Sequence, residues 1–320
     1  MYRPEVGAYL ANQRLSGGLF LHSLHDRLGE PQWTESQGFD RQDDEPRAAW
    51  VRLVGKRIDS TSRDGEFDVD SKSLMLQLGG DVADWSVASE TDRAHVGLMA
   101  GYGKAWTDGS ARGNPNRAEA TTQGFHIGAY GTWYQNNESR LGWYTDAWGL
   151  LGWFDNRVDG DSLGTVKYDS RVVTLSAEAG YAGRPKEDSD WILEPQAQLV
   201  YVHSRADGFD EPNGTRIDGA EGSGWVGRLG LRTHRTWVHD SGRRTQPYLT
   251  LNWWHDRIDN VIAFNEIAMK DLYPKDRYEV KLGVNVLHDR GWTGWGNVGW
   301  QWGQQSYSAL SARLGARYTW

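Results

Sequence analysis

The side chains of this sequence that are best suited to chemistry are nine histidines, and there is no cysteine. Four of the histidines precede an aspartate, and two of these pairs, His255-Asp256 and His288-Asp289, fall at the ends of expected strands. Such a neighbour can orient an imidazole that acts as a base. The other histidines are scattered, and neither HExxH nor a paired metal-ligand spacing accompanies them. Since the serines and histidines give no nucleophile–base assignment, we expect no enzyme, no metal site and no cofactor, and we interpret the His-Asp pairs as solvated.

A second set of functional groups, the charged side chains, alternates with apolar residues along several segments. Residues 277–288, for example, set Tyr278 and Val280 against Glu279 and Lys281. Side chains alternate across a β-strand, so such a segment has one apolar face and one charged face. The charged positions that we expect to line an interior are Arg52, Lys56, Asp146, Glu178, Glu194, Arg228, Arg232, Glu279, Lys281, Arg313 and Arg317.

The elements that position these side chains are mostly strands, after a helical start. Residues 4–28 have leucines near helical spacing and predict a helix. Gly17-Gly18 lie in its middle, where glycines weaken a helix and can break it in two. Residues 29–46 are polar and predict a loop, and from residue 47 the period becomes two. The expected strands are about 47–59, 69–83, 93–107, 120–135, 140–156, 165–182, 190–205, 222–238, 245–258, 277–288, 293–304 and 307–320.

The aromatic residues indicate a membrane interface. The chain has 18 Trp and 14 Tyr but only 7 Phe, and Trp and Tyr place an apolar ring in lipid with a polar group in water. Pairs of them share one strand face ten residues apart, an interval over which a tilted strand climbs roughly 25 Å, as in an outer-membrane barrel. The expected girdle residues are Trp143, Trp153, Trp191, Tyr201, Trp225 and Trp253.

The connections between the expected strands alternate in length. Those near 60–68, 108–119, 157–164, 206–221 and 259–276 are long, and those near 84–92, 136–139, 183–189, 239–244 and 289–292 are mostly shorter. Long loops on one side and short turns on the other are typical of outer-membrane barrels. The last connection, near 305–306, falls on the long side of this pattern and yet is short.

The final segment, residues 307–320, has Leu314, Tyr318 and Trp320 on its apolar face and arginines on the other. An aromatic final residue is typical of the last strand of a transmembrane barrel. A soluble barrel or propeller that buries its tryptophans is the alternative, but it leaves the girdle spacing and the loop alternation unexplained.

The composition excludes other classes. The net charge of -8 argues against a nucleic-acid partner, and no apolar run of 18 residues is present, so we expect no transmembrane helix. Met1 is not followed by a signal peptide, and we therefore expect the targeting segment of an envelope protein to lie upstream.

Only a closed sheet satisfies every backbone group in lipid. We therefore expect an all-β chain, a transmembrane antiparallel barrel of about twelve strands at residues 47–320, with the helix and loop of residues 1–46 in its lumen. The lumenal charges have two interpretations. They line a hydrated channel that holds an extended polypeptide and then grips a helix, or they are paired charges that a polar interior requires. Mixed signs suit a polypeptide better than an ion-selective pore.

In these residues the chain resembles the translocator β-domain of autotransporters (type V secretion), and most closely the AIDA-type adhesin family. The resemblance rests on PEVGAYLANQR, LHDRLG, GWYTDAWGLLGWFDNRV, WILEPQAQLVY and LGARYTW, in that order. It implies a translocator and anchor in the outer membrane of a Gram-negative bacterium, which delivers an N-terminal passenger, an adhesin, to the cell surface. Leu314, Tyr318 and Trp320 resemble the signal that the barrel-assembly machinery reads.

The resemblance also implies the partners: outer-membrane lipid and lipopolysaccharide, the chain's own passenger, the barrel-assembly machinery and periplasmic chaperones, with a monomeric barrel and no nucleic acid. Some relatives cut their passenger at an Asn-Asn pair in the lumenal helix. The only such pair here, Asn136-Asn137, falls in an expected turn, so we predict no such cleavage in this segment. The alternative function is an outer-membrane barrel enzyme or a small-solute porin, which would begin at its first strand, whereas residues 1–46 precede it here.

Overall fold

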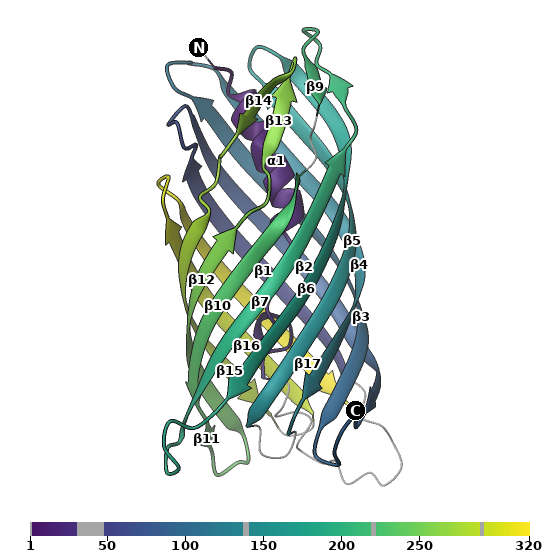
Figure 1. Cartoon of the computed structure of the whole chain (residues 1–320), viewed down its shortest axis with the longest axis vertical. Helices are drawn as coiled ribbons and strands as arrows, with labels where there is room; N and C mark the ends of the chain where they lie inside the picture. Colours follow the sequence, from purple (N-terminus) through teal and green to yellow (C-terminus); the bar gives the residue numbers. More distant parts are fainter. Residues whose placement is uncertain (1, 31–47, 137–140, 219–221, 289–290) are drawn as a thin grey trace.

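The structure, a computed structural model, describes residues 2–30, 48–136, 141–218, 222–288 and 291–320. In these residues twelve long antiparallel strands form a closed barrel around the N-terminal helices (Figure 1). The barrel strands are β1 (Ala48–Thr61), β2 (Phe67–Trp85), β3 (Arg93–Ala111), β4 (Arg117–Tyr134), β5 (Gly142–Gly160), β6 (Gly164–Ala182), β7 (Trp191–Ala206), β10 (Gly222–Arg235), β12 (Arg244–Asp256), β15 (Asp276–Leu287), β16 (Trp292–Gly303) and β17 (Ser308–Thr319). The all-β barrel predicted from the sequence is confirmed.

The barrel closes through its first and last strands. β1 pairs with β17 in an unbroken antiparallel register from Ala48 opposite Thr319 to Asp59 opposite Ser308. On the far side of the sheet, β10 pairs with β12 across the connection that holds the short strand β11 (Trp237–Val238). Every long strand therefore has two neighbours, and no sheet edge is left to face lipid.

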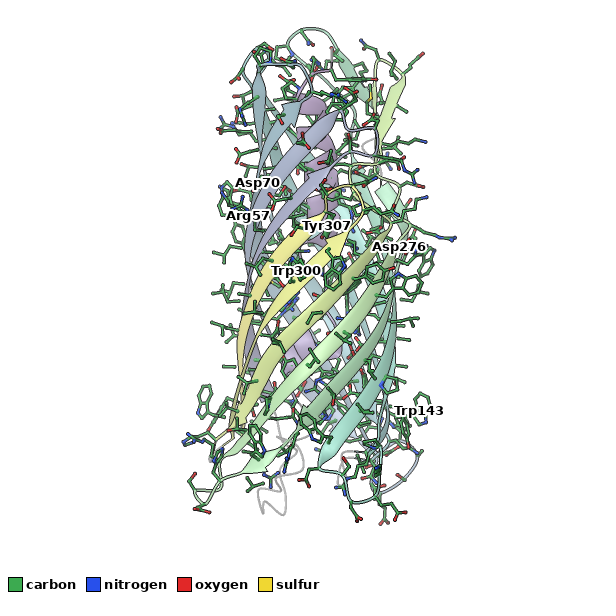
Figure 2. The ribbon with its side chains drawn as sticks, turned by 90° about the vertical axis from the view of Figure 1, so that its left-hand side faces the viewer. Arg57, Asp70, Trp143, Asp276, Trp300 and Tyr307 are labelled. Carbon is green, nitrogen blue, oxygen red and sulfur yellow. The ribbon has the colours of Figure 1, made fainter. Side chains whose placement is uncertain are left out.

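Side chains alternate between the lumen and the outside, as the two-residue period predicts. On β7, Leu199 points outward and is 49% exposed, while the adjacent Val200 is 1% exposed. Many other large apolar side chains lie exposed on the outer face (Figure 2). A water-facing sheet would not expose so much apolar surface, whereas a lipid-facing sheet requires it.

Three of the five connections predicted to be long are short hairpin turns. β1–β2, β3–β4 and β5–β6 turn at residues 62–66, 112–116 and 161–163, because the paired strands continue beyond their expected ends. The prediction was wrong here because a polar strand that projects past a membrane has the composition of a loop, although its backbone groups pair across the hairpin.

The connections after β7 and β12 are long, and they build a second sheet at the upper end of the barrel. Its four strands lie in the order β14-β13-β9-β8. They are β8 (Phe209–Asp210), β9 (Arg216–Asp218), β13 (Val261–Phe264) and β14 (Ile267–Lys270).

The short connection before the last strand is a tight turn. The Tyr307 N–H donates to the Gln304 carbonyl at 3.1 Å, and Gln305 and Ser306 have φ of 60° and 52°. Positive φ at both central residues suits the right-handed twist of the strands that the turn joins. The connection after β12 packs against this turn and the neighbouring end of β1. The Tyr273 and Tyr307 ring centres lie 6.4 Å apart, and the Ser60 hydroxyl on β1 donates to the carbonyl of Leu272 at 2.8 Å.

The N-terminal segment forms two helices, α1 (Glu5–Gly18) and α2 (Leu24–Leu28), so the predicted helix does break after the glycine pair. The two lie one below the other inside the barrel, and α1 runs down from the upper end (Figure 1). Neither helix is long and apolar enough to span a membrane. The predicted loop, the boundary at residues 46–47 and Asn137 lie wholly or largely outside the described residues.

The lumen has an apolar zone above and a mixed zone below. In the upper zone α1 packs against the inward faces of the projecting hairpins, and it is buried nearly all round. The upper cluster includes Val6, Tyr9, Leu10, Phe67, Val69, Ala105, Ala118, Val158 and Val166. In the lower zone α2 meets aromatic rings that point inward, and these include Trp50, Tyr130, Tyr144, Trp148 and Trp295. The polar lumen expected from the sequence is therefore only part of the interior.

Several of the inward rings lie over a glycine of the neighbouring strand. Trp295 stands directly opposite Gly315, and a Cβ at Gly315 would lie 2.2 Å from its ring. Tyr144 covers Gly180 across the β5–β6 pair in the same way. Each ring occupies the space that the glycine leaves free, so these pairs seal the wall and fix the register.

In a gel loaded without boiling, a folded barrel migrates as a fast, compact band, and the unfolded chain migrates more slowly. We predict that Gly315→Ala lowers the temperature at which the refolded barrel converts from the compact band to the unfolded band. Overpacking of this kind costs about 1–3 kcal/mol, on the order of 5 °C for a chain of this size. Gly55→Ala is the control, because a Cβ at Gly55 would meet nothing within 4 Å. Equal conversion temperatures for the two variants would contradict the packing argument.

Candidate functional site: the lumenal clamp

The candidate site is the segment His22–Glu30 together with the barrel wall around it, which we call the lumenal clamp. The segment folds locally because Ser23 caps α2, and its hydroxyl accepts the Asp26 N–H at 3.3 Å. Gly29 ends the helix with a φ of 68°, and its N–H donates to the carbonyl of His25 at 3.0 Å. The short helix is thereby fixed in a shape that sends successive side chains in different directions.

The ionisable side chains of this segment meet ionisable groups on the wall, nearly all of them buried. His25 Nε2 lies 2.5 Å from Glu194, Asp26 lies 2.7 Å from Lys281 and 3.8 Å from Arg313, Arg27 lies 2.6 Å from Asp146, and Glu30 lies 3.1 Å from Arg232. The wall residues belong to β5, β7, β10, β15 and β17, so the contacts reach around the circumference. A polar segment is thus held from several sides at once.

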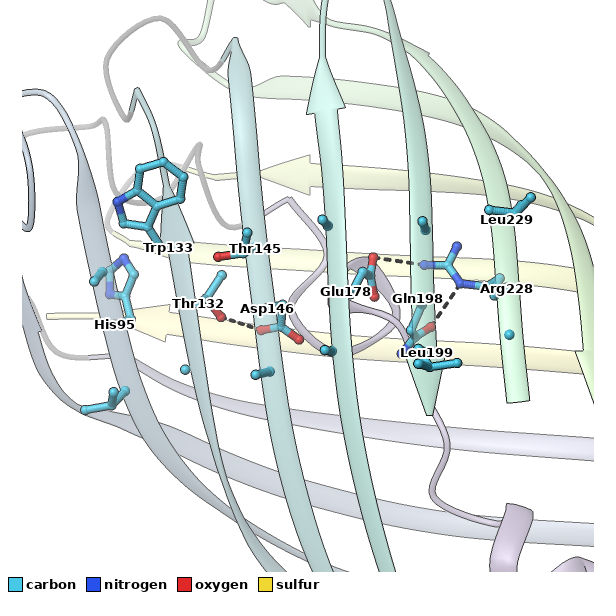
Figure 3. A pocket seen from close by; sticks show the side chains of 18 of the residues that line it. His95, Thr132, Trp133, Thr145, Asp146, Glu178, Gln198, Leu199, Arg228 and Leu229 are labelled. Atoms are coloured by element: carbon cyan, nitrogen blue, oxygen red, sulfur yellow. Dashed lines mark hydrogen bonds and ion pairs between the residues drawn. The ribbon is translucent and has the colours of Figure 1, made fainter. Parts of the chain in front are cut away.

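The most enclosed of these contacts is the Arg27–Asp146 pair. Both side chains are fully buried, and Arg27 donates to both carboxylate oxygens, at 2.6 and 3.2 Å. The Thr132 hydroxyl donates to the same carboxylate at 2.6 Å (Figure 3). The guanidinium also stands 4.2 Å from the centre of the Tyr130 ring. Such a bidentate contact fixes the orientation of α2 as well as its position.

Polar groups of the wall bind each other and the backbone of the segment. Arg228 bridges Glu178 at 2.9 Å and Gln198 at 3.0 Å, as Figure 3 shows. Glu178 accepts the Leu24 N–H at 3.0 Å, and Gln198 donates to the carbonyl of His22 at 2.8 Å. The wall therefore satisfies backbone groups at the N-terminal side of α2 that the helix itself cannot.

Above the clamp, α1 is held by fewer polar contacts. The Asn12 amide donates to the carbonyls of Thr121 and Arg157, at 3.3 and 3.2 Å. Arg14 pairs with Asp256, which also pairs with Arg277 at 3.1 Å. Apolar packing dominates the rest of this helix.

The structure places all eleven charged residues expected in the interior on the inward face. Those that contact the helical segment directly are Arg52, Asp146, Glu178, Glu194, Arg232, Lys281 and Arg313. Arg228 and Glu279 act within the wall, and Arg317 pairs with Asp81 at 3.0 Å near the lower end. Lys56 lines a cavity that is described below.

The residues that the wall grips were not predicted as site residues. Ser23 to Glu30 (SLHDRLGE) carries both signs of charge within one turn, and that was the available signal. The inward tryptophans were also missed, because tryptophan was expected in the girdles. His22, for example, stacks on Trp148 at 4.4 Å.

The six expected girdle residues point outward and fall into two levels. Trp143 and Trp191 begin their strands at the lower end, and the other four lie toward the upper end. Figure 2 shows Trp143 at the lower level and Trp300, another outward tryptophan on β16, well above it. The residues of the proposed assembly signal, Leu314, Tyr318 and Trp320, are exposed on the outer face, where Trp320 stacks on Tyr318 at 5.8 Å.

Among the described residues we find no catalytic arrangement of nucleophile, base and acid. His255 contacts Asp276 at 2.9 Å rather than the adjacent Asp256, and Asp289 lies outside the described residues. Gly160 to Gly164 (GDSLG) has the G-x-S-x-G spacing, but it forms the β5–β6 hairpin turn rather than a strand-to-helix elbow. Among the described residues no group of three His, Asp or Glu side chains is placed to hold a metal.

We predict that Arg27→Met lowers the thermal conversion temperature of the compact band, because it leaves the buried Asp146 unpaired at a cost of about 3–5 kcal/mol. Arg27→Met combined with Asp146→Asn should recover more than half of that loss. Arg57→Met is the control, since Arg57 pairs with Asp70 on the exposed face of a hairpin and should matter little. A double variant less stable than Arg27→Met alone would show that the two residues do not act as a pair.

Comparison with known proteins agrees with this geometry. The family model described as autotransporter beta-domain matches residues 49–299. Protein YdeU of Escherichia coli K12 is 36% identical over 332 residues, which cover the whole of this chain and 70% of that protein. The autotransporter adhesin AIDA-I of Escherichia coli is 28% identical, over 99% of this chain and 25% of AIDA-I. The chain thus spans about a quarter of some of the curated relatives that it matches.

The crystal structure of the transport unit of AIDA-I matches over 100% of both chains, with a TM-score of 0.83 and 26% identity. The resemblance inferred from the sequence motifs is therefore confirmed by the family model, by the relatives and by the fold. The chain belongs to the autotransporter β-domain family, whose barrels serve as translocator domains in the outer membrane of Gram-negative bacteria.

Proposed function

We propose that this chain anchors an N-terminal passenger in the outer membrane and delivers it to the cell surface. The observation that carries the proposal is the direction of the N-terminal segment. α1 begins at the upper end of the barrel and runs down the lumen toward the clamp, so a polypeptide joined to Met1 would continue outward from the upper end (Figure 1). Family membership implies such a linked passenger.

In this proposal the upper end faces the exterior and the lower end faces the periplasm. The projecting hairpins and the second sheet lie at the upper end, and the chain ends at the lower one (Figure 1). The passenger would be an adhesin, by analogy with the relative AIDA-I, which is an autotransporter adhesin. Residues 1–46 would be the linker and residues 47–320 the translocator barrel.

The partners follow from the exposed surfaces. Lipid and lipopolysaccharide would contact the outward girdle residues. Periplasmic chaperones would deliver the unfolded chain to the barrel-assembly machinery, which would recognise Leu314, Tyr318 and Trp320. The barrel would act as a monomer, since the closed sheet offers no strand edge to a second copy. It would carry out this work without catalysis.

The small-solute porin is the weaker proposal because the lumen is occupied. α1 contributes buried side chains to the upper lumenal cluster and α2 to the lower one, where the clamp lies. A porin needs a continuous water-filled path.

Surface delivery is tested by placing an epitope-tagged reporter before Met1, behind a secretion signal, and treating intact cells with protease. We expect the reporter to be cleaved from outside. The control is the same fusion ending at residue 306, which lacks the strand that closes the barrel, and its reporter should be protected or degraded internally. A reporter that stays protected in the full-length fusion, with the barrel folded in the membrane, would contradict the proposal.

Removal of residues 1–28 should raise single-channel conductance in planar lipid bilayers, because the helices fill the lumen. The comparison requires that both proteins are folded, which is shown by a compact gel band that migrates more slowly after boiling. Equal conductance of the two folded proteins would contradict a plugging role for the helices.

A further inference from the structure

A cavity of about 100 Å³ lies in the lumen between the helices and the wall near the β1–β17 seam. The helices and three strands contribute charged groups to its lining. These groups are Arg14 from α1, Arg52 and Lys56 from β1, Arg277 from β15, Arg313 from β17, and one carboxylate, Asp26 from α2. Five cations thus face a small enclosed space together with one anion.

The acidic residues around the cavity are shared rather than in excess. Arg14 and Arg277 both pair with Asp256. Arg313 lies 3.8 Å from Asp26 and 3.9 Å from Glu279.

Lys281, just outside the cavity, draws on the same two carboxylates, at 2.7 Å from Asp26 and 3.8 Å from Glu279. Four cations therefore share three carboxylates before the remaining pair on β1 is considered.

Neither of those two β1 residues forms an ion pair with a described residue, although the Asp26 carboxylate lies close enough to Arg52 to interact with its charge. Arg52 is 1% exposed, and its Nε donates to Gln77 at 2.6 Å while Nη1 donates to the carbonyl of Asp26 at 3.5 Å. Its Nη2 is buried and has no hydrogen-bond partner in the described structure. Lys56 makes no ion pair or hydrogen bond with any described residue.

A cation removed from bulk water is costly unless an opposite charge compensates it. Here two such cations share the inward face of one strand and line one cavity, and a buried guanidinium nitrogen there is unpartnered. We propose that the cavity binds one small inorganic anion, such as phosphate or sulfate, between Arg52 and Lys56.

The bound anion would connect the wall to the helices. Arg14 lines the cavity from α1, and Arg52 already reaches the backbone of α2. The site is therefore complete only when the helical segment is in the lumen. It requires nothing of the passenger, so it stands or falls independently of the proposed delivery function.

The test is the thermal conversion temperature of the full chain, refolded in detergent, at constant ionic strength. Sodium phosphate or sulfate replaces gluconate, an organic anion larger than either. We expect a saturable rise of several degrees for the unchanged protein and no rise for Lys56→Gln. In gluconate alone, Lys56→Gln should convert at or above the temperature of the unchanged protein, because an uncompensated charge has been removed.

Lys72→Gln is the matched control, since Lys72 is exposed on β2 and the substitution removes the same charge outside the lumen. It should keep the full response. An absent rise, or an equal rise in the unchanged protein and in Lys56→Gln, would overturn the proposal.

If Lys56→Gln gives no compact band, crystals of the unchanged chain soaked in selenate decide the question. An anomalous peak within hydrogen-bond distance of Lys56 Nζ is expected, and a cavity without one would overturn the proposal.

Discussion

The structure depends on one constraint, the need of every backbone N–H and C=O in lipid to find a partner within the protein. The pairing of β1 with β17 meets it by closing the sheet. Closure has a consequence, because it creates an interior whose charged groups are cut off from bulk water. Asp146 and Glu194 are buried on the inward face, and each finds a partner on the α2 segment. The helices are therefore part of the solution that the closed sheet requires.

The two zones of the lumen make different contributions. Apolar packing of α1 against the hairpins removes apolar surface from water, and this effect does not depend strongly on the exact position of the helix along the lumen. The ion pairs of the clamp determine that position. Buried ion pairs add little net stability, but they penalise misalignment strongly, because a shift leaves charges unpaired. Asp26 and Arg27 are adjacent and reach Lys281 and Asp146 on strands far apart in the sheet, so a displaced helix would lose both contacts.

Much of the fold follows from local sequence pattern, and the rest depends on non-local partners. The two-residue period located the barrel strands, and the glycine pair located the helix break, because both signals lie within one segment. The inward direction of Trp295 was not predictable from its own strand, since the space it fills is provided by Gly315 on the next one. The charges of the inward face could be assigned by parity, but the partner of each could not, because that depends on the rotation and depth of α2. The hairpin at residues 112–116 was mistaken for a long loop because strand pairing outside lipid leaves no hydrophobic signature.

The most direct test of the account is a disulfide between the helix and the wall. The chain has no cysteine, and a Cβ at Gly7 would lie 3.4 Å from the Cβ of Phe67, close to the separation in a disulfide. The account predicts that Gly7→Cys with Phe67→Cys cross-links under mild oxidation in the folded protein. It predicts far less cross-linking with Asp68→Cys in place of Phe67→Cys, since Asp68 faces outward. A folded barrel that fails to form the first cross-link, or forms both equally, would show that the helix does not occupy the lumen as described.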